Sequence, residues 1–409
     1  MQPLSSLAQL IKPSATLAAG ARAKQLKAQG IRVFDFSLGE PDFPTPEHIG
    51  VAAAEAVRAG HTRYTPAAGT PALREAIAYR YSHRYGLPTT ADEVVVSNGA
   101  KHAIYNALAV LCGPGDEVLV PTPFWTSYAD IIEMVGARVH LVPTPNDQHF
   151  KLTPAQLRSA LTPKTRVLLM NSPCNPTGTV YSRAELQALA DVVLERPHLA
   201  VLSDEIYDCL VFGEASHTCF AALRPGLRDR TIVVSGASKT YAMTGWRMGW
   251  AVGPAHLIKA MGDLQSQQTG CPSSVSQFAV LAALQGDQTC VEQMRQEFQK
   301  RRDLVCELLG RIPGLRFHKP DGAFYVFIDA SAYLGRSFRG QKITDTVMLC
   351  QALFDQERIN LVPGSAFGAE GFLRLSYTSS RAELTAGLER LADCLSQMAA
   401  DAVWDRRRG

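Results

Sequence analysis

Short runs of β-branched and aliphatic residues alternate with amphipathic stretches through the middle of the chain. The runs cover residues 93–96, 117–120, 138–141, 166–170, 199–202 and 231–234. Because they are apolar almost without interruption, they predict strands buried on both faces, as in a parallel sheet covered by helices. The stretches 100–111 and 183–194 repeat their apolar positions at helical spacing and are long enough to be crossover helices. The pattern predicts an α/β domain over residues 46–299.

The pattern changes after residue 290. A long charged helix is predicted over residues 291–309, followed by strand-like pieces at 323–328 and 372–375 and a final amphipathic helix from Arg381. These elements predict a smaller α+β domain, formed by residues 1–45 and 300–409. The sequence contains no internal repeat. No flexible linker separates the two predicted domains, so we expect them to pack tightly.

Composition narrows the class of protein. The 409 residues include 41 basic and 38 acidic side chains, and a net charge of +3 gives no sign of a nucleic-acid or anionic-membrane binder. Nine cysteines, an odd number without a Cys-x-x-Cys pair, argue against a disulfide framework and a zinc site. No His-Glu-x-x-His, signal-peptide pattern or membrane-length apolar run occurs. We therefore expect a cytoplasmic protein without a metal.

One lysine stands directly after the predicted strand 231–234, in Ser-Gly-Ala-Ser-Lys-Thr-Tyr-Ala-Met-Thr-Gly-Trp-Arg-Met-Gly over residues 235–249. A lysine among small residues at a strand end is poorly solvated, which lowers its amine pKa and suits Schiff-base chemistry. Taken alone, an ordinary surface lysine is the alternative. The segment resembles, at each position, the cofactor-attachment motif of class I/II aminotransferases, the fold-type I pyridoxal-phosphate enzymes. The resemblance implies that Lys239 carries pyridoxal 5'-phosphate as a Schiff base, while Ser238 and Arg247 hold its phosphate.

Two further motifs match the same family. In Leu-Ser-Asp-Glu-Ile-Tyr over residues 202–207, Asp204 matches the aspartate that pairs with the pyridine nitrogen, and Tyr207 the tyrosine that hydrogen-bonds the 3'-oxygen. In Asn-Ser-Pro-Cys-Asn-Pro-Thr-Gly over residues 171–178, Asn175 matches the asparagine that donates to that oxygen. Seen alone, the second motif is simply a good turn. The resemblance implies a catalytic set of Lys239, Asp204 and Tyr207.

Five other residues, in three parts of the chain, match residues that surround the cofactor in this family. Gly99, Ala100 and Lys101 lie where a predicted helix begins, and backbone N–H groups at a helix start attract a phosphate. Trp125 matches the aromatic residue that stacks on the pyridine ring, and Tyr64 a tyrosine that reaches the cofactor phosphate of a neighbouring subunit. The last match implies a homodimer with shared active sites. Each match has an ordinary alternative: a simple glycine turn at residues 99–101, a core position for Trp125, and a surface position on a single chain for Tyr64.

Substrate contacts follow from the same resemblance. Arg374 matches the arginine that binds the α-carboxylate, and the Gly39 N–H is expected to donate to the same group; Asn175 and Trp125 are expected to face the substrate as well. The chain is similar over nearly its full length to the bacterial branch of aspartate aminotransferases. There Lys101 would contact the side-chain carboxylate, and Ser14 and Thr16 would help to cover the site.

The resemblance therefore implies a ping-pong transamination between aspartate or glutamate and 2-oxoglutarate or oxaloacetate. Three alternatives stay open at this point. A β-elimination lyase on the same fold could use the same lysine, aspartate and arginine. Lys12 leaves amination of prephenate or aromatic substrates possible. A non-catalytic regulator that binds the cofactor is the third, although the short N-terminal segment offers no room for a DNA-binding domain.

Overall fold

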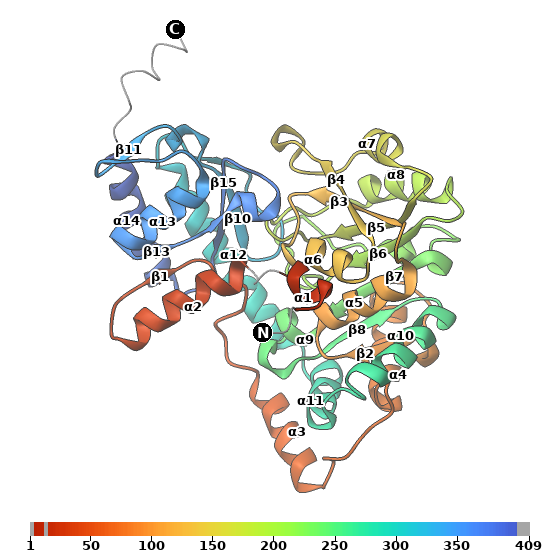
Figure 1. The fold of residues 1–409 in the computed structure, drawn as a ribbon. Helices are drawn as coiled ribbons and strands as arrows, with labels where there is room; N and C mark the ends of the chain where they lie inside the picture. Colours follow the sequence, from red (N-terminus) through yellow and green to blue (C-terminus); the bar gives the residue numbers. More distant parts are fainter. Residues whose placement is uncertain (1–3, 12–14, 399–409) are drawn as a thin grey trace.

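A computed structural model describes residues 4–11 and 15–398 of the chain. Two sheets organise this part of the molecule and lie apart from one another (Figure 1). The helices that surround them are α1 (Ser6–Leu10), α2 (Ala15–Ala28), α3 (Glu47–Arg58), α4 (Pro71–Arg84), α5 (Ala100–Leu111), α6 (Ser127–Met134), α7 (Pro154–Ala160), α8 (Arg183–Leu194), α9 (Ala237–Thr240), α10 (Ala255–Gln268), α11 (Ser274–Gln285), α12 (Thr289–Gly310), α13 (Thr346–Glu357) and α14 (Arg381–Ser396).

The large sheet has seven strands within the described residues. Their order is β2 (Val94–Ser97), β8 (Gly249–Val252), β7 (Thr231–Gly236), β6 (Ala200–Asp204), β5 (Thr165–Asn171), β3 (Glu117–Thr122) and β4 (Arg138–Pro143). All neighbours pair in parallel except at β8, which runs antiparallel to both β2 and β7. The α/β fold class predicted from the alternating pattern is confirmed.

Both faces of this sheet are covered by helices because successive strand residues point to opposite sides. On β2, Val95 packs in a cluster with residues of α5, α6 and α10. Its neighbours Val94 and Val96 pack in a second cluster with residues of α3, α4 and α11. The apolar run at β2 is therefore covered on both faces, as the sequence predicted, although β2 lies at an edge of the sheet and pairs antiparallel with β8.

The second sheet is antiparallel and smaller. It orders β14 (Val362–Pro363), β15 (Phe372–Ser376), β10 (Tyr325–Asp329) and β9 (Arg316–Phe317), and it packs in one apolar cluster with residues of α12, α13 and α14. Two short pairs lie outside both sheets: β1 (Phe34–Asp35) with β13 (Ile359–Asn360), and β11 (Ser337–Phe338) with β12 (Gln341–Lys342).

The first of these pairs brings residues near the start of the chain beside residues near its end. Helix α12 runs through residues 299 and 300 without a break. The division of the chain at residues 46 and 299 stays a prediction.

One expectation about the strands is wrong. Strand β4 is not buried on both sides: Arg138, Leu141 and Pro143 are exposed. β4 lies at one edge of the sheet, where α6 and α7 cover it only in part, whereas β2 at the other edge is covered by α4, α5 and α10 and is buried throughout. No helix within the described residues is both long and apolar enough to cross a membrane.

Candidate active site

A cavity of about 720 Å³ lies beyond the carboxyl ends of β5, β6 and β7. This is where open α/β sheets bind ligands. Most of the residues singled out in the sequence line it: Gly39, Ala100, Lys101, Trp125, Asn175, Asp204, Tyr207, Ser238, Lys239, Arg247 and Arg374. They come from segments more than 300 residues apart, and only the fold brings them together.

Lys239 lies on α9, the short helix that follows β7. Its Nζ donates to the Gly39 carbonyl and lies 5.8 Å from the centre of the Phe324 ring. Burial lowers the pKa of this amine to about 8, with Arg247 and Arg374 acting in the same direction and Glu40 opposing them. An amine with such a pKa is free in a useful fraction near neutral pH, which a nucleophile or base needs.

Asp204 ends strand β6 and is 4% exposed. One carboxylate oxygen accepts from the Tyr128 hydroxyl at 2.6 Å, and the other accepts from the Ile206 N–H at 3.2 Å. Burial raises the pKa of Asp204 to about 6, although both hydrogen bonds favour the carboxylate. A buried carboxylate with this pKa is prepared to pair with a cationic or protonated group in the cavity.

Tyr207 lies three residues beyond Asp204 and also faces the cavity. Its hydroxyl is 2.9 Å from that of Tyr325, and burial raises its pKa well above the usual range. Both phenols are therefore neutral hydrogen-bonding groups at physiological pH.

Arg374 lies on β15, at the opposite wall of the cavity, and is 1% exposed. Its Nη1 donates to Asn175 Oδ1 at 3.1 Å and its Nη2 to the Ser37 carbonyl at 2.7 Å, while Nε has no hydrogen-bond partner within the described residues. No carboxylate lies within ion-pair distance of it in that part of the chain. A buried cation is costly without an anionic partner, so this guanidinium indicates a site for a carboxylate ligand.

A second anion site lies at the start of α5. Gly99 has φ +89°, which favours glycine, and a Cβ there would lie 2.3 Å from Arg247 Nη2. The missing side chain thus lets the Arg247 guanidinium approach the helix start, where Ala100 and Lys101 line the cavity. Ser238 adds a hydroxyl. Helix N–H groups, a guanidinium and a hydroxyl together suit a phosphate.

Lys101 and Trp125 form one unit at the cavity wall. The Lys101 Nζ lies 5.0 Å from the centre of the Trp125 ring, and burial, followed by the charge of Arg247, lowers its pKa. The residue is nevertheless exposed overall, and it lines the cavity with its amine over the Trp125 ring.

Three predicted residues remain: Tyr64, Ser14 and Thr16. Tyr64 is 95% exposed and does not line the cavity of its own chain. Ser14 lies outside the described residues. Thr16 belongs to α2, but its side chain is not among those described.

Sequence reasoning missed three residues that contact the predicted ones. They are Tyr128 beside Asp204, Tyr325 beside Tyr207, and Ser37, whose carbonyl accepts from Arg374. Tyr128 follows Trp125 by one helical turn, which is a weak signal for the same cavity. The other two carry no signal in the sequence, because their contacts depend on chain segments that are far apart.

Comparisons with known proteins agree with this geometry. The chain matches the sequence profile of the family described as aminotransferase class I and II over residues 31–391. It is 44% identical over 392 residues to an aspartate aminotransferase of Rhizobium meliloti, covering 96% of this chain and 95% of that one. It is 43% identical over 378 residues to an aspartate/prephenate aminotransferase of Cereibacter sphaeroides, covering 92% and 94%.

Solved structures give the same result. A crystal structure of the Rhizobium meliloti aspartate aminotransferase superimposes with a TM-score of 0.93 at 43% identity, covering 98% of this chain and 100% of that one. An aspartate aminotransferase of Thermus thermophilus, solved with maleate, gives 0.91 at 40% identity, covering 96% and 100%. The chain belongs to the class I and II aminotransferases, the pyridoxal-phosphate-dependent family that its lysine motif resembles.

Proposed function

We propose that this aminotransferase moves the amino group between aspartate or glutamate and the oxo acids 2-oxoglutarate or oxaloacetate. The observation that carries the proposal is the convergence of Lys239, Asp204 and Arg374 on one cavity. The cavity thus holds a deprotonatable amine, a buried carboxylate and a buried guanidinium that has no carboxylate within ion-pair distance among the described residues. An amino acid bound to a pyridine cofactor needs these three groups.

Pyridoxal phosphate fits the residues present. Its phosphate would be held by the start of α5, Ser238 and Arg247, where Gly99 leaves room for the guanidinium. Asp204 would face the pyridine nitrogen and Trp125 the ring, while Tyr207 and Asn175 would donate to the 3'-oxygen. When bound, the cofactor accepts the electron pair that is left when the Cα–H bond breaks.

The chain's own residues supply the remaining chemistry. Asp204 would keep a proton on the pyridine nitrogen, because a nearby carboxylate favours the cationic form of the base. Arg374 binds the α-carboxylate through two parallel hydrogen bonds and orients the Cα–H bond for cleavage. The Gly39 N–H adds a donor. The Lys239 amine would take the proton from the substrate's Cα and return it at the cofactor's C4' atom.

Dicarboxylates are the proposed substrates because Lys101, beside Trp125 in the cavity lining, offers a cation in addition to Arg374. The names of the relatives support this choice, as does the presence of maleate, a dicarboxylate, in the Thermus thermophilus structure. Ser14 and Thr16 are proposed to cover the bound substrate. Some relatives are named for prephenate as well, which makes prephenate the first further amino acceptor to test.

Aspartate and 2-oxoglutarate mixed with the purified protein and the cofactor should yield glutamate and oxaloacetate. Formation of pyruvate and ammonia instead would indicate a β-elimination lyase on the same fold. Binding of the cofactor without turnover of any amino acid would indicate a regulator. Borohydride reduction followed by peptide mass analysis would show whether Lys239 carries the cofactor.

Replacing Lys101 with glutamine should weaken selection for dicarboxylates. We expect kcat/KM for aspartate to fall by about 10- to 100-fold, since a hydrogen bond to a charged group contributes about 1.5–3 kcal/mol. Alanine, which has no side-chain carboxylate, should lose far less. Steady-state kinetics with both amino acids measure the difference, and an equal loss for the two would contradict the assignment.

Replacing Tyr128 with phenylalanine should move the pH dependence of cofactor binding. The hydroxyl stabilises the Asp204 carboxylate, so its loss raises a pKa that is already about 6. The carboxylate form then persists only at higher pH. The pH below which the affinity for pyridoxal phosphate falls should therefore rise by about one pH unit. Equilibrium titrations between pH 5 and 8 would measure it; coincident curves for wild type and variant would contradict it.

We propose that the working unit is a homodimer in which Tyr64 reaches the partner's cofactor phosphate. The support is that Tyr64 is 95% exposed in the single chain, although it belongs to a matched motif. Sedimentation equilibrium should give twice the chain mass of 44.4 kDa. A cytoplasmic location is proposed because all nine cysteines are free, which suits a reducing compartment; cell fractionation would test it.

A further inference from the structure

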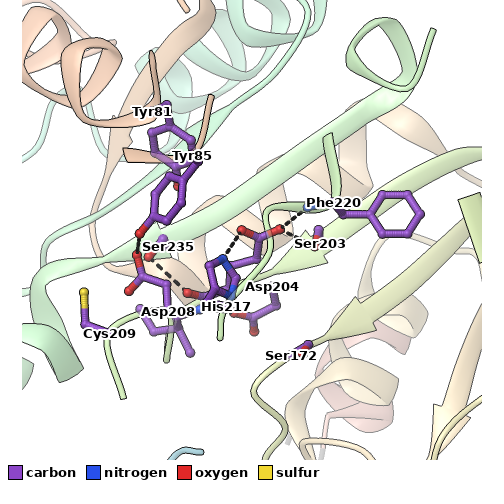
Figure 2. A network of polar contacts seen from close by, with 12 residues as sticks. Tyr81, Tyr85, Ser172, Ser203, Asp204, Asp208, Cys209, His217, Phe220 and Ser235 are labelled. Carbon is purple, nitrogen blue, oxygen red and sulfur yellow. Dashed lines mark hydrogen bonds and ion pairs between the residues drawn. The ribbon is translucent and has the colours of Figure 1, made fainter. Parts of the chain in front are cut away.

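The segment that carries Asp204 and Tyr207 has a second, buried side. Residues 204–208 leave β6 in a turn closed by the Asp208 N–H, which donates to the Glu205 carbonyl at 3.0 Å. Asp204 and Tyr207 line the cavity, whereas Glu205 and Asp208 do not. They are 2% and 3% exposed and belong to a polar network on the far side of the turn (Figure 2).

Asp208 joins three chain segments in this network. One oxygen accepts from Arg80 Nη2 of α4 at 2.8 Å and from the Tyr85 hydroxyl. The other oxygen accepts from Thr240 Oγ1 at 3.4 Å. Thr240 directly follows Lys239 on α9, so a single buried carboxylate contacts α4, the Tyr207 turn and the turn that presents the lysine.

Glu205 completes the network beside it. Its Oε1 accepts from Ser203 Oγ at 2.8 Å and from the Phe220 N–H at 3.0 Å, and its Oε2 lies 2.9 Å from His217 Nε2. Every carboxylate oxygen of Glu205 thus has a partner. The backbone carbonyl of Glu205 also accepts from Ser235 Oγ of β7 at 3.3 Å.

The charges of the network balance when His217 is protonated. Burial alone would raise the pKa of Asp208, but Arg80 and His217 hold it well below its usual range. Burial also opposes protonation of His217, yet Glu205 raises its pKa. Two carboxylates then face two cations, Arg80 and His217. A paired network that is also hydrogen-bonded resists rearrangement, because loss of one partner leaves a buried charge.

We propose that Asp208 is a positioning residue that fixes the Lys239 amine and the Tyr207 hydroxyl relative to each other. The inference deepens the proposed function and rests on it. Asp208 touches neither the cavity nor its ligands, and it acts through the two turns that it links. Small displacements of groups in a reactive site have large effects on rate, which gives such an anchor its importance.

The test compares Asp208→Asn, Thr240→Val and Thr240→Ser with wild type. The first readout needs no cofactor: competitive acylation of the apoprotein, followed by peptide mass analysis, gives the pH midpoint of the Lys239 amine. We expect about pH 8 for wild type, and a shift of at least about half a pH unit in Asp208→Asn and Thr240→Val. Thr240→Ser keeps the hydroxyl and should retain the wild-type midpoint.

The second readout is kinetic. Asp208→Asn should lower kcat about tenfold or more, with a much smaller change in KM, because the reacting groups rather than the substrate contacts are displaced. Trp250→Phe is the matched control: its Nε1 donates to Tyr81 in the same buried layer, and it contacts neither Asp208 nor the cavity. It should leave both readouts unchanged.

A purely structural role would lower the melting temperature of Asp208→Asn but leave the midpoint and kcat as in wild type, and that result would overturn the proposal. If Asp208→Asn does not fold, the two Thr240 variants decide. A shifted pH midpoint of the Lys239 amine in Thr240→Val but not in Thr240→Ser supports the proposed link between Asp208 and the lysine. Wild-type midpoints in both variants overturn it. Failure of wild type to form glutamate would reject the proposed function instead, while the acylation profile would still report on the link.

Discussion

Replacing Lys239 with alanine should lower the rate of transamination by at least about 10⁴-fold, because in the proposed mechanism one amine supplies both the attachment point and the proton carrier. Its pKa, lowered by burial to about 8, leaves about one-tenth of it free at pH 7. Four lysines line the cavity. Of these four, only Lys239 lies on the short helix α9, directly after strand β7. The rate of glutamate formation from aspartate and 2-oxoglutarate measures the loss.

Two controls separate lost chemistry from lost structure. Lys101→Ala removes another amine of the same cavity and should leave activity with alanine as substrate nearly intact. Small primary amines added to Lys239→Ala should restore part of the proton transfer, since the variant leaves space where the side chain was. A Lys239→Ala protein as active as wild type would refute the assignment.

The helices and strands of the large sheet followed from the sequence because their signals are local. The two crossover helices begin and end where their apolar periodicity does, at 100–111 and 183–194. The strands have apolar runs because neighbours cover both their faces. This argument failed for β4, an edge strand that helices cover only in part, because that cover depends on how distant segments pack and not on the composition of the strand. Strand β8 was missed because four residues beginning with glycine give no strand signal of their own.

The candidate site divides in the same way. Lys239, Asp204 and Asn175 belong to motifs in which several neighbouring residues are specified together, so one segment suffices to find them. Tyr128 and Ser37 act through single contacts across the fold. The one-turn spacing of Tyr128 from Trp125 is only a weak signal, and nothing along the chain indicates the contact of Ser37. The Asp208 network was likewise invisible, because Arg80 lies 128 residues before it.

Replacing Arg374 with methionine should lower kcat/KM for every amino acid by about a thousandfold, or about 4 kcal/mol, the scale of truncating one side of a buried charge pair. The variant removes the fork that would bind the α-carboxylate and leaves Asn175 Oδ1 and the Ser37 carbonyl without their donor. Arg374→Lys keeps the charge but not the planar pair of donors, so it should recover only part of the loss. Because an α-carboxylate is common to all substrates, the factor should be similar for aspartate and alanine, in contrast to Lys101→Gln. Maleate affinity, read from the absorption of the bound cofactor, should fall in parallel. A loss of kcat/KM confined to aspartate would indicate that Arg374 binds the side-chain carboxylate of the substrate and not its α-carboxylate. Arg374 would then not orient the Cα–H bond, on which the proposed proton transfer depends.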